Sequence, residues 1–233
     1  SSVGMDKAYT KVIFEKANIC QAPYIYVKKN KEQYMYMDKA FNEQEMSLED
    51  VTKIVEKEIG FPAFVKPANS GSSVGIHKSK NKEELKEHIQ YAAKFDRKIL
   101  IEKGIQGKEV ECAVLGNDEV IASCVGEIKP ADEFYSYDAK YQNEASKTII
   151  PADLDERISE EIRKLAIKAF KAIDGKGLSR VDFFVEDKTN QIYINEINTL
   201  PGFTKISMYP KLFEAVGIQY HELLDKLIDL AQE

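Results

Sequence analysis

Two strand-like segments around a short polar turn constrain the fold more than any other feature of the sequence. RVDFFVE and QIYINEIN flank DKTN at residues 187–190, an arrangement that is typical of an antiparallel β-hairpin. Residues two apart on a strand share a face, so Arg180 and Asp182 point to the same side. Glu196 and Asn198 do the same on the second strand. If a loop of about five residues joins the strands, the two carboxylates lie opposite each other and Arg180 lies opposite Asn198.

The paired carboxylates of this hairpin suggest a metal site. Opposed carboxylates repel each other unless one is protonated or a cation bridges them. Asp182 and Glu196, with the amide oxygen of Asn198, form a ligand set that Mg²⁺ accepts beside water and substrate phosphates. The alternative is a charged, solvated hairpin end in another register, and the hairpin alone favours that alternative.

The rest of the chain reads as a mixture of helices and strands. Apolar residues at helical spacing, with Ser47 and Asn81 as predicted N-caps, indicate amphipathic helices. With 233 residues, 43% of them hydrophobic, the chain can form one domain or two compact lobes. We expect an α+β protein of two α/β lobes, residues 1–102 and 103–233. The predicted helices cover 5–18, 48–59, 81–92, 158–173 and two short C-terminal segments, and the predicted strands outside the hairpin cover 23–29, 61–67, 98–103, 108–116 and 119–128.

A run of small residues follows the predicted strand at 61–67. VKPANSGSSVG (65–75) places Lys66 just before residues that let a backbone pass close to a ligand. A phosphate group is the obvious candidate, because Lys66 adds a positive charge beside the loop. The string matches neither GxxxxGK[ST] nor GxGxxG before a helix, so neither common phosphate-loop motif applies.

The strand that ends near residue 103 leads into a second group of candidate residues. ILIEKGIQGKEVE carries Glu102, Lys103 and Glu109. A strand that leads to a hinge and then to an acidic residue is suited to bind the edge of an adenine base and the hydroxyl groups of a ribose. Glu109 and Glu111 equally suit exposed strand positions, and the segment alone does not decide between the two interpretations.

Two loops complete the candidate site. In NTLPGFTKIS, Gly202 allows backbone amides to face a developing oxyanion, and Ser207 lies near the predicted start of a helix. A loop followed by a helix N-cap explains the same residues without any catalytic role. The segment 130–150 is polar, aromatic and aperiodic, and a loop of that length is usually functional or disordered. Its Lys140 suits a lid that closes over phosphate, although a solvated surface lysine is the simpler interpretation.

Composition narrows the class of partner. The net charge is −6 with both signs interspersed, which argues against a nucleic acid or an anionic membrane as partner. No apolar run approaches the ~20 residues of a membrane span. Cys20, Cys112 and Cys124 include no CxxC pair, so we expect reduced cytosolic thiols and no zinc site. SSVGMDK has neither an initiator methionine nor a signal-peptide layout, so we expect a fragment or a processed product.

The motifs taken together resemble those of one known family. In chain order they are MDK, VKPANSGSSVG, LIEK, GKEVE, YDAKY, RVDFF and NEINTLPGFT. Their order and spacing are similar to those of the D-alanine–D-alanine ligases of the ATP-grasp superfamily, from Met5 to the C-terminus. No single motif is decisive, but seven in order are specific. The resemblance implies the ATP-grasp fold, in which two lobes sandwich a nucleotide.

The resemblance also implies a role for each matching residue, including a lid loop at about 130–148. For ATP the matching residues are Lys7, Lys66, Ser73, Glu102, Lys103, Glu109, Phe134 and Lys140. For two Mg²⁺ ions, with Mn²⁺ as an alternative metal, they are Asp182, Glu196 and Asn198. For catalysis they are Arg180, Gly202, Lys140 and Ser72, and for the second substrate they are Tyr141, Ser207 and Met208.

The activity implied by the resemblance is ATP-dependent joining of D-alanine to a second D-alanine through an acyl phosphate. Such an enzyme makes peptidoglycan precursors in the cytoplasm. D-Ala–D-Ser ligation of the vancomycin-resistance type, another ATP-grasp carboxylate–amine ligation, and an inactive nucleotide-binding fragment are the alternatives. The Lys140–Tyr141 pair resembles amide-forming members more than lactate-specific ones.

The chain departs from the family pattern at its start. Family members carry roughly another hundred residues before the MDK helix, an N-terminal domain of ordinary size. We therefore expect the ATP-grasp part alone, with an incomplete site for the first D-alanine and poor activity in isolation. The expected partners are D-alanine, ATP and the missing domain, and neither a nucleic acid nor a membrane is expected. A homodimer of the full-length protein is an open alternative to a monomer.

Overall fold

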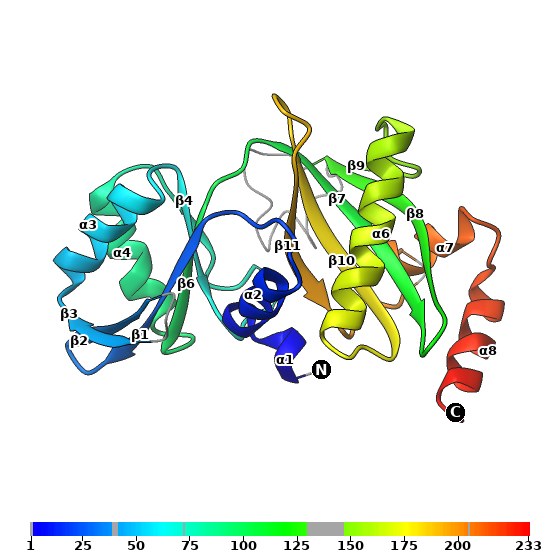
Figure 1. Ribbon diagram of the computed structural model, residues 1–233, viewed down its shortest axis with the longest axis horizontal. Coiled ribbons are helices and arrows are strands. Elements are labelled where there is room, and N and C mark those ends of the chain that lie inside the picture. The colour runs from blue at the N-terminus through cyan, green and yellow to red at the C-terminus, as the bar shows by residue number, and fades with distance from the viewer. Residues whose placement is uncertain (1, 39–41, 72, 130–146, 205) are drawn as a thin grey trace.

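The computed structural model describes residues 2–38, 42–71, 73–129, 147–204 and 206–233, which form two antiparallel sheets with helices packed against them (Figure 1). The expected α+β class is confirmed. The loop predicted at 130–148 falls mostly outside the described residues, and its end forms the short strand β9. In the described part of the chain, no helix is both long and apolar enough to cross a lipid bilayer.

The first sheet has six strands in the order β3-β2-β1-β6-β4-β5. Its core contains apolar residues of alternate strand positions, such as Ile25 and Val27, against one stripe of each of two helices. Ser47 and Asn81 cap these helices as predicted, because each side chain accepts a hydrogen bond from a backbone amide three residues on. The elements are β1 (Tyr24–Asn30), β2 (Gln33–Met37), β3 (Glu43–Met46), α3 (Leu48–Glu58), β4 (Ala63–Pro67), β5 (His77–Ser79), α4 (Lys82–Ala92) and β6 (Lys98–Lys103).

The second sheet has five strands in the order β11-β10-β7-β8-β9. Helix α6 covers one face through Ile162, Ala166 and Phe170, and α7 and α8 cover the other face. The elements are β7 (Gly107–Gly116), β8 (Val120–Lys129), β9 (Lys147–Ile149), α6 (Glu156–Ala172), β10 (Gly177–Glu186), β11 (Ile192–Asn198), α7 (Met208–Glu214) and α8 (Tyr220–Leu230).

The first predicted helix, residues 5–18, begins at Lys7 rather than at Met5, and a separate short helix precedes it. Asp6 separates α1 (Ser2–Met5) from α2 (Lys7–Lys16), because its backbone is extended and its carboxylate accepts hydrogen bonds from the first amides of α2. Ala8 of α2 packs with Tyr26 and Leu100 of the first sheet, whereas Phe14 belongs to the core of the second. Helix α2 therefore contacts both sheets (Figure 1).

The first sheet ends at Lys103 and the second begins at Gly107. The proposed division into lobes 1–102 and 103–233 stays a prediction, and the contacts of α2 with both sheets show that the first lobe does not pack as a separate unit.

Candidate nucleotide-binding site

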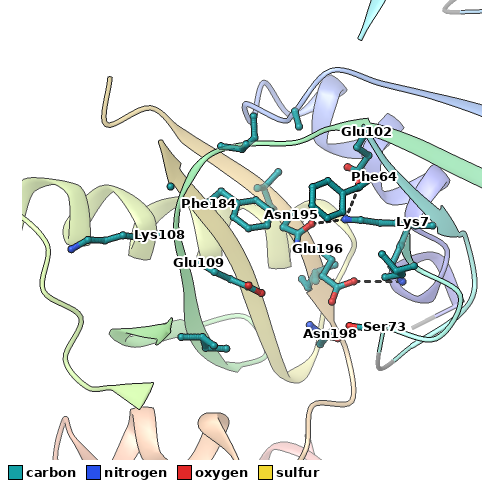
Figure 2. A pocket seen from close by; sticks show the side chains of 18 of the residues that line it. Lys7, Phe64, Ser73, Glu102, Lys108, Glu109, Phe184, Asn195, Glu196 and Asn198 are labelled. Carbon is teal, nitrogen blue, oxygen red and sulfur yellow. Dashed lines mark hydrogen bonds and ion pairs between the residues drawn. The ribbon is translucent and has the colours of Figure 1, made fainter. Parts of the chain in front are cut away.

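A cavity of about 560 Å³ is lined by residues from both sheets (Figure 2). Phe64 and Glu102 come from the first sheet, and Glu109, Phe184 and Glu196 come from the second. The cavity therefore has apolar rings and carboxylates at its walls. Four predicted ATP-site lysines and serines, Lys7, Lys66, Lys103 and Ser73, also line it.

Glu102 is an enclosed charged group of this cavity. Its side chain is 5% exposed and lies between two ammonium groups, with Lys11 Nζ 2.5 Å from Oε1 and Lys66 Nζ 2.6 Å from Oε2. Burial alone would raise the pKa of Glu102, but the two lysines outweigh it and lower the pKa to about 2. Glu102 is therefore ionised throughout the neutral range.

Lys66 reaches across the cavity from β4 to β11. Besides the ion pair with Glu102, its ammonium donates a hydrogen bond to Asn195 Oδ1 at 3.1 Å. Burial disfavours the charged form, but Glu102 outweighs it, so the pKa of Lys66 lies above its usual value. The lysine that sequence motifs place beside the glycine loop is thus held charged between the two sheets.

Lys7 connects the glycine loop to the second sheet. Its Nζ donates to the carbonyl oxygen of Ser70 at 2.6 Å and lies 3.5 Å from Glu196 Oε2. Its backbone amide also donates to Ala68. Lys7, the start of the loop and β11 therefore meet at the cavity.

A β-bulge in β11 explains why two consecutive side chains line the cavity. Asp182 pairs with Glu196 and Phe183 pairs with Ile194, so Asn195 is the extra residue. Ile194 and Ile197 are both buried in the core on the α6 side, three residues apart rather than two. Asn195 and Glu196 therefore both line the cavity, where Figure 2 shows them beside each other.

The predicted register of the hairpin is confirmed. Arg180 pairs with Asn198, and Asp182 pairs with Glu196, so the two carboxylates share a sheet face. Asp182 is buried, and its two oxygens accept hydrogen bonds from Arg180 Nε and Nη2, each at 2.7 Å. Asn198 Nδ2 donates to Asp182 at 2.9 Å.

Positive charges compensate the carboxylates at this hairpin. Arg180 Nε also lies 3.0 Å from Glu111 Oε2, and Lys7 lies beside Glu196. Glu111 is buried, so its interpretation as an exposed strand position is wrong, whereas Glu109 lines the cavity. Carboxylate and amide oxygens suit Mg²⁺. In the described part of the chain, however, no group of three or more His, Cys, Asp or Glu is arranged to hold a metal ion.

A family model described as "D-ala D-ala ligase C-terminus" matches residues 13–229, which is most of the chain. The chain belongs to the D-Ala–D-Ala ligase C-terminal family. The family resemblance expected from the sequence motifs is therefore confirmed.

Named relatives extend this result. The D-alanine--D-alanine ligase of Acetivibrio thermocellus is 57% identical over 231 residues, which are 99% of this chain and 58% of that protein. The ligase of the same name from Ruminiclostridium cellulolyticum is 52% identical over 237 residues, which cover 100% of this chain and 59% of that protein. The chain therefore spans less than two thirds of the length of these relatives.

Two solved structures have the same fold. The VanG D-Ala:D-Ser ligase from Enterococcus faecalis superposes with a TM-score of 0.83 at 35% identity, over 98% of this chain and 62% of that one. The D-alanine-D-alanine ligase from Coxiella burnetii superposes with a TM-score of 0.81 at 34% identity, over 98% of this chain and 57% of that one. The ATP-grasp fold expected from the sequence is thereby confirmed.

Among the described residues, five predicted site residues are absent from the cavity lining: Arg180, Asp182, Gly202, Ser207 and Met208. Gly202 and Ser207 meet at the loop before α7, where a Cβ on Gly202 would lie 3.0 Å from Ser207 Oγ. Ser207 Oγ accepts a hydrogen bond from the amide of Thr204. Met208 is buried in the core between α7, α8 and the second sheet. Ser72, Phe134, Lys140 and Tyr141 lie outside the described residues.

Sequence patterns missed two residues that contact the ion pair of Lys66 and Glu102. Lys11 lies on an amphipathic helix, where a lysine is normally a solvated residue, and its burial depends on the fold. Asn195 would face away from Glu196 in a regular strand, and only the bulge brings both to the cavity. The MDK…TK spacing in α2, one helical turn from Lys7 to Lys11, was the available signal for the first.

Proposed function

We propose that the chain is the ATP-binding part of a D-alanine–D-alanine ligase. The observation that carries the proposal is one shared cavity. Lys7 of α2, Lys66 of the first sheet and the glycine loop line it, and so do Glu196 and Asn198 of the second sheet. Lysines and backbone amides suit phosphates, and carboxylate and amide oxygens suit the metal that accompanies them. The ligase names of relatives that are 52–57% identical support D-alanine as both substrates.

The base and ribose of ATP would occupy the part of the cavity near Glu102, Lys103 and Glu109. Phe64 and Phe184 line the same space, and their rings offer apolar contact to a purine. The triphosphate would extend toward Lys66, Lys7 and the loop around Ser73.

The proposed reaction has two steps. An oxygen of the first D-alanine carboxylate attacks the γ-phosphorus of ATP, so ADP leaves and an acyl phosphate forms. The free amine of the second D-alanine then attacks the acyl carbon, the nitrogen loses a proton, and inorganic phosphate leaves as the C–O bond breaks. In the proposal, Arg180 and the amide of Gly202 stabilise the negative charge of the tetrahedral intermediate.

Asp182, Glu196 and Asn198 are the residues that would hold Mg²⁺. When bound, Mg²⁺ would neutralise charge on the phosphates and orient them. Arg180 and Lys7 now compensate Asp182 and Glu196.

The test is D-alanine-dependent release of ADP and phosphate by the protein at the length of its relatives. A panel of D-alanine, D-serine, D-lactate and L-alanine as second substrate separates the amide ligases from the alternatives. We expect the highest kcat/KM with D-alanine, and a loss of about 10²–10³ in kcat for Lys66→Met. Phosphate release that does not depend on a D-amino acid would refute the ligase assignment, and a preference for D-serine would refute the substrate.

A further inference from the structure

Lys11 is a buried lysine that contacts the nucleotide cavity only through another residue. Its side chain is 2% exposed, and its ammonium lies 2.5 Å from Glu102 Oε1. Lys66 contacts the other oxygen of the same carboxylate and lines the cavity, whereas Lys11 is absent from the described residues that line it. Glu102 therefore separates a lysine that faces the cavity from one that does not.

The charges of this cluster do not cancel. One carboxylate lies between two ammonium groups, so with both lysines protonated these three residues together carry one excess positive charge. Burial lowers the pKa of Lys11 and Glu102 opposes this effect, while Glu196 and Glu109 add to the effect of Glu102 on Lys66. The excess lies on Lys66, since only this ammonium can reach a ligand in the cavity. Asn195 supplies a neutral acceptor to Lys66 and does not change this balance.

Stability alone gives a weak reason for such a residue. Buried ion pairs often contribute little to the free energy of folding relative to apolar residues of similar size. The ring centroid of Tyr24 lies 5.3 Å from Lys11 Nζ, so an aromatic surface borders this ammonium. A charged lysine at this position therefore needs an explanation other than packing.

We propose that Lys11 is a positioning residue that neutralises Glu102 and so leaves the charge of Lys66 available to an anionic ligand, the phosphates of a nucleotide. The inference rests on the proposed function, since it assigns a triphosphate to the space beside Lys66. Without Lys11, Glu102 and Lys66 form a neutral pair, and the phosphates compete with a buried carboxylate for the same ammonium. With Lys11, the carboxylate is already compensated from the far side.

The experiment measures dissociation constants for adenosine and for the Mg²⁺ complex of a non-hydrolysable ATP analogue. The dissociation constant for adenosine divided by that for the analogue reports how much the phosphates contribute to binding. Contacts with the base affect both constants and cancel in this ratio. For Lys11→Met we expect this ratio to fall about tenfold, with adenosine binding changed less than about threefold. Lys11→Arg keeps the charge and should restore the ratio to within about threefold of the wild type.

Two further variants make the test specific. In the Lys11→Met/Glu102→Gln double variant, Lys66 no longer faces a carboxylate, so the ratio should equal that of Glu102→Gln alone within about threefold. Lys98→Met is the matched control. Lys98 pairs with Asp6 at 2.6 Å, its side chain is 13% exposed, and it does not line the cavity, so its loss should leave the ratio unchanged within about twofold.

The outcomes separate the inference from the proposed function. If the wild type binds the analogue no more tightly than adenosine, the proposed function is wrong. If the wild type shows a strong phosphate contribution and Lys11→Met keeps the same ratio, the inference alone is wrong. If Lys11→Met does not fold, the comparison of Glu102→Gln with the double variant decides, and a difference larger than about threefold between them overturns the inference.

Discussion

Glu102 forms ion pairs with two lysines from different parts of the chain, Lys11 on α2 and Lys66 on β4. Together with the bond from Lys66 to Asn195, these contacts join α2, the first sheet and β11. The sequence motifs identified Lys66 and Glu102 as neighbours of one ligand. They could not identify Lys11 or Asn195, because helix burial and a strand bulge depend on contacts far apart in the sequence.

A first prediction concerns how the ionisation of Glu102 contributes to the stability of the fold in acid. Its folded pKa of about 2 lies below the ordinary value of 4.5. Its ionisation therefore stabilises the fold by about 3 kcal/mol above about pH 4.5, and this stabilisation is lost as the pH falls from there through about 2.

Urea unfolding at about pH 5 and about pH 3 checks this prediction. Glu102→Gln should lower the free energy of unfolding at pH 5, and it should also make that free energy less sensitive to pH than in the wild type. The exposed Glu119→Gln is the control and should change neither quantity by more than about 0.5 kcal/mol. Equal pH dependence in Glu102→Gln and the wild type would contradict the prediction.

At the scale of elements, periodicity predicted the parts with a strong apolar stripe. The N-caps Ser47 and Asn81, the strand β6 and the hairpin register are confirmed. Strands β2, β3 and β5 were not predicted, because they are short and, in the case of EQEM in β3, exposed along most of their length. Pairing of β2 with β1, of β3 with β2 and of β5 with β4 holds them in place, and that pairing leaves no periodic signal in the sequence.

A second prediction concerns the glycine loop. Gly75 has a φ of +75°, and a Cβ there would lie 2.8 Å from Phe95 and from Pro67. Gly75→Ala should lower the free energy of unfolding by more than about 1 kcal/mol and weaken binding of the Mg²⁺–ATP analogue, because the loop must shift. Gly71→Ala is the control, since a Cβ there meets no atom within 4 Å. Thermal unfolding and calorimetry measure both effects, and equal results for the two variants would contradict the account.

A third prediction concerns the bulge. Asn195→Ala removes the acceptor of the Lys66 hydrogen bond at 3.1 Å while keeping the backbone of β11. Because hydrogen bonds to charged groups are worth about 1.5–3 kcal/mol, we expect the free energy of urea unfolding to fall by at least about 1 kcal/mol. Gln44→Ala on the exposed strand β3 should change it by less than about 0.5 kcal/mol. A matching small effect for Asn195→Ala would show that the bond contributes nothing to stability.

At the scale of the whole molecule, the described residues proposed to bind the nucleotide come from both sheets and from α2. The chain spans 58–59% of the length of two ligase relatives. We propose that the first D-alanine needs groups from the rest of that length. The nucleotide site and the ligation site should therefore depend differently on the length of the protein.

A fourth prediction follows from this difference. The 233-residue chain should bind the Mg²⁺–ATP analogue, yet ligate D-alanine two to three orders of magnitude more slowly than the protein at the length of its relatives. Positioning two reactants can lower a barrier by ~7–11 kcal/mol, and losing ~3–4 kcal/mol of that gives such a decrease. Dipeptide formation by both proteins under equal conditions measures it. Comparable turnover would show that the 233-residue chain already holds the first substrate.

The most direct test of the central claim, a nucleotide site shared by the two sheets, is calorimetry of an ATP analogue with and without Mg²⁺. The wild-type chain should bind the analogue at least about tenfold more tightly with Mg²⁺ than with a chelator. Glu196→Gln should remove most of this difference and leave adenosine binding unchanged, since its carboxylate faces the proposed metal rather than the base. Equal binding with Mg²⁺ and with chelator, or an unchanged Mg²⁺ effect in Glu196→Gln, would contradict the account.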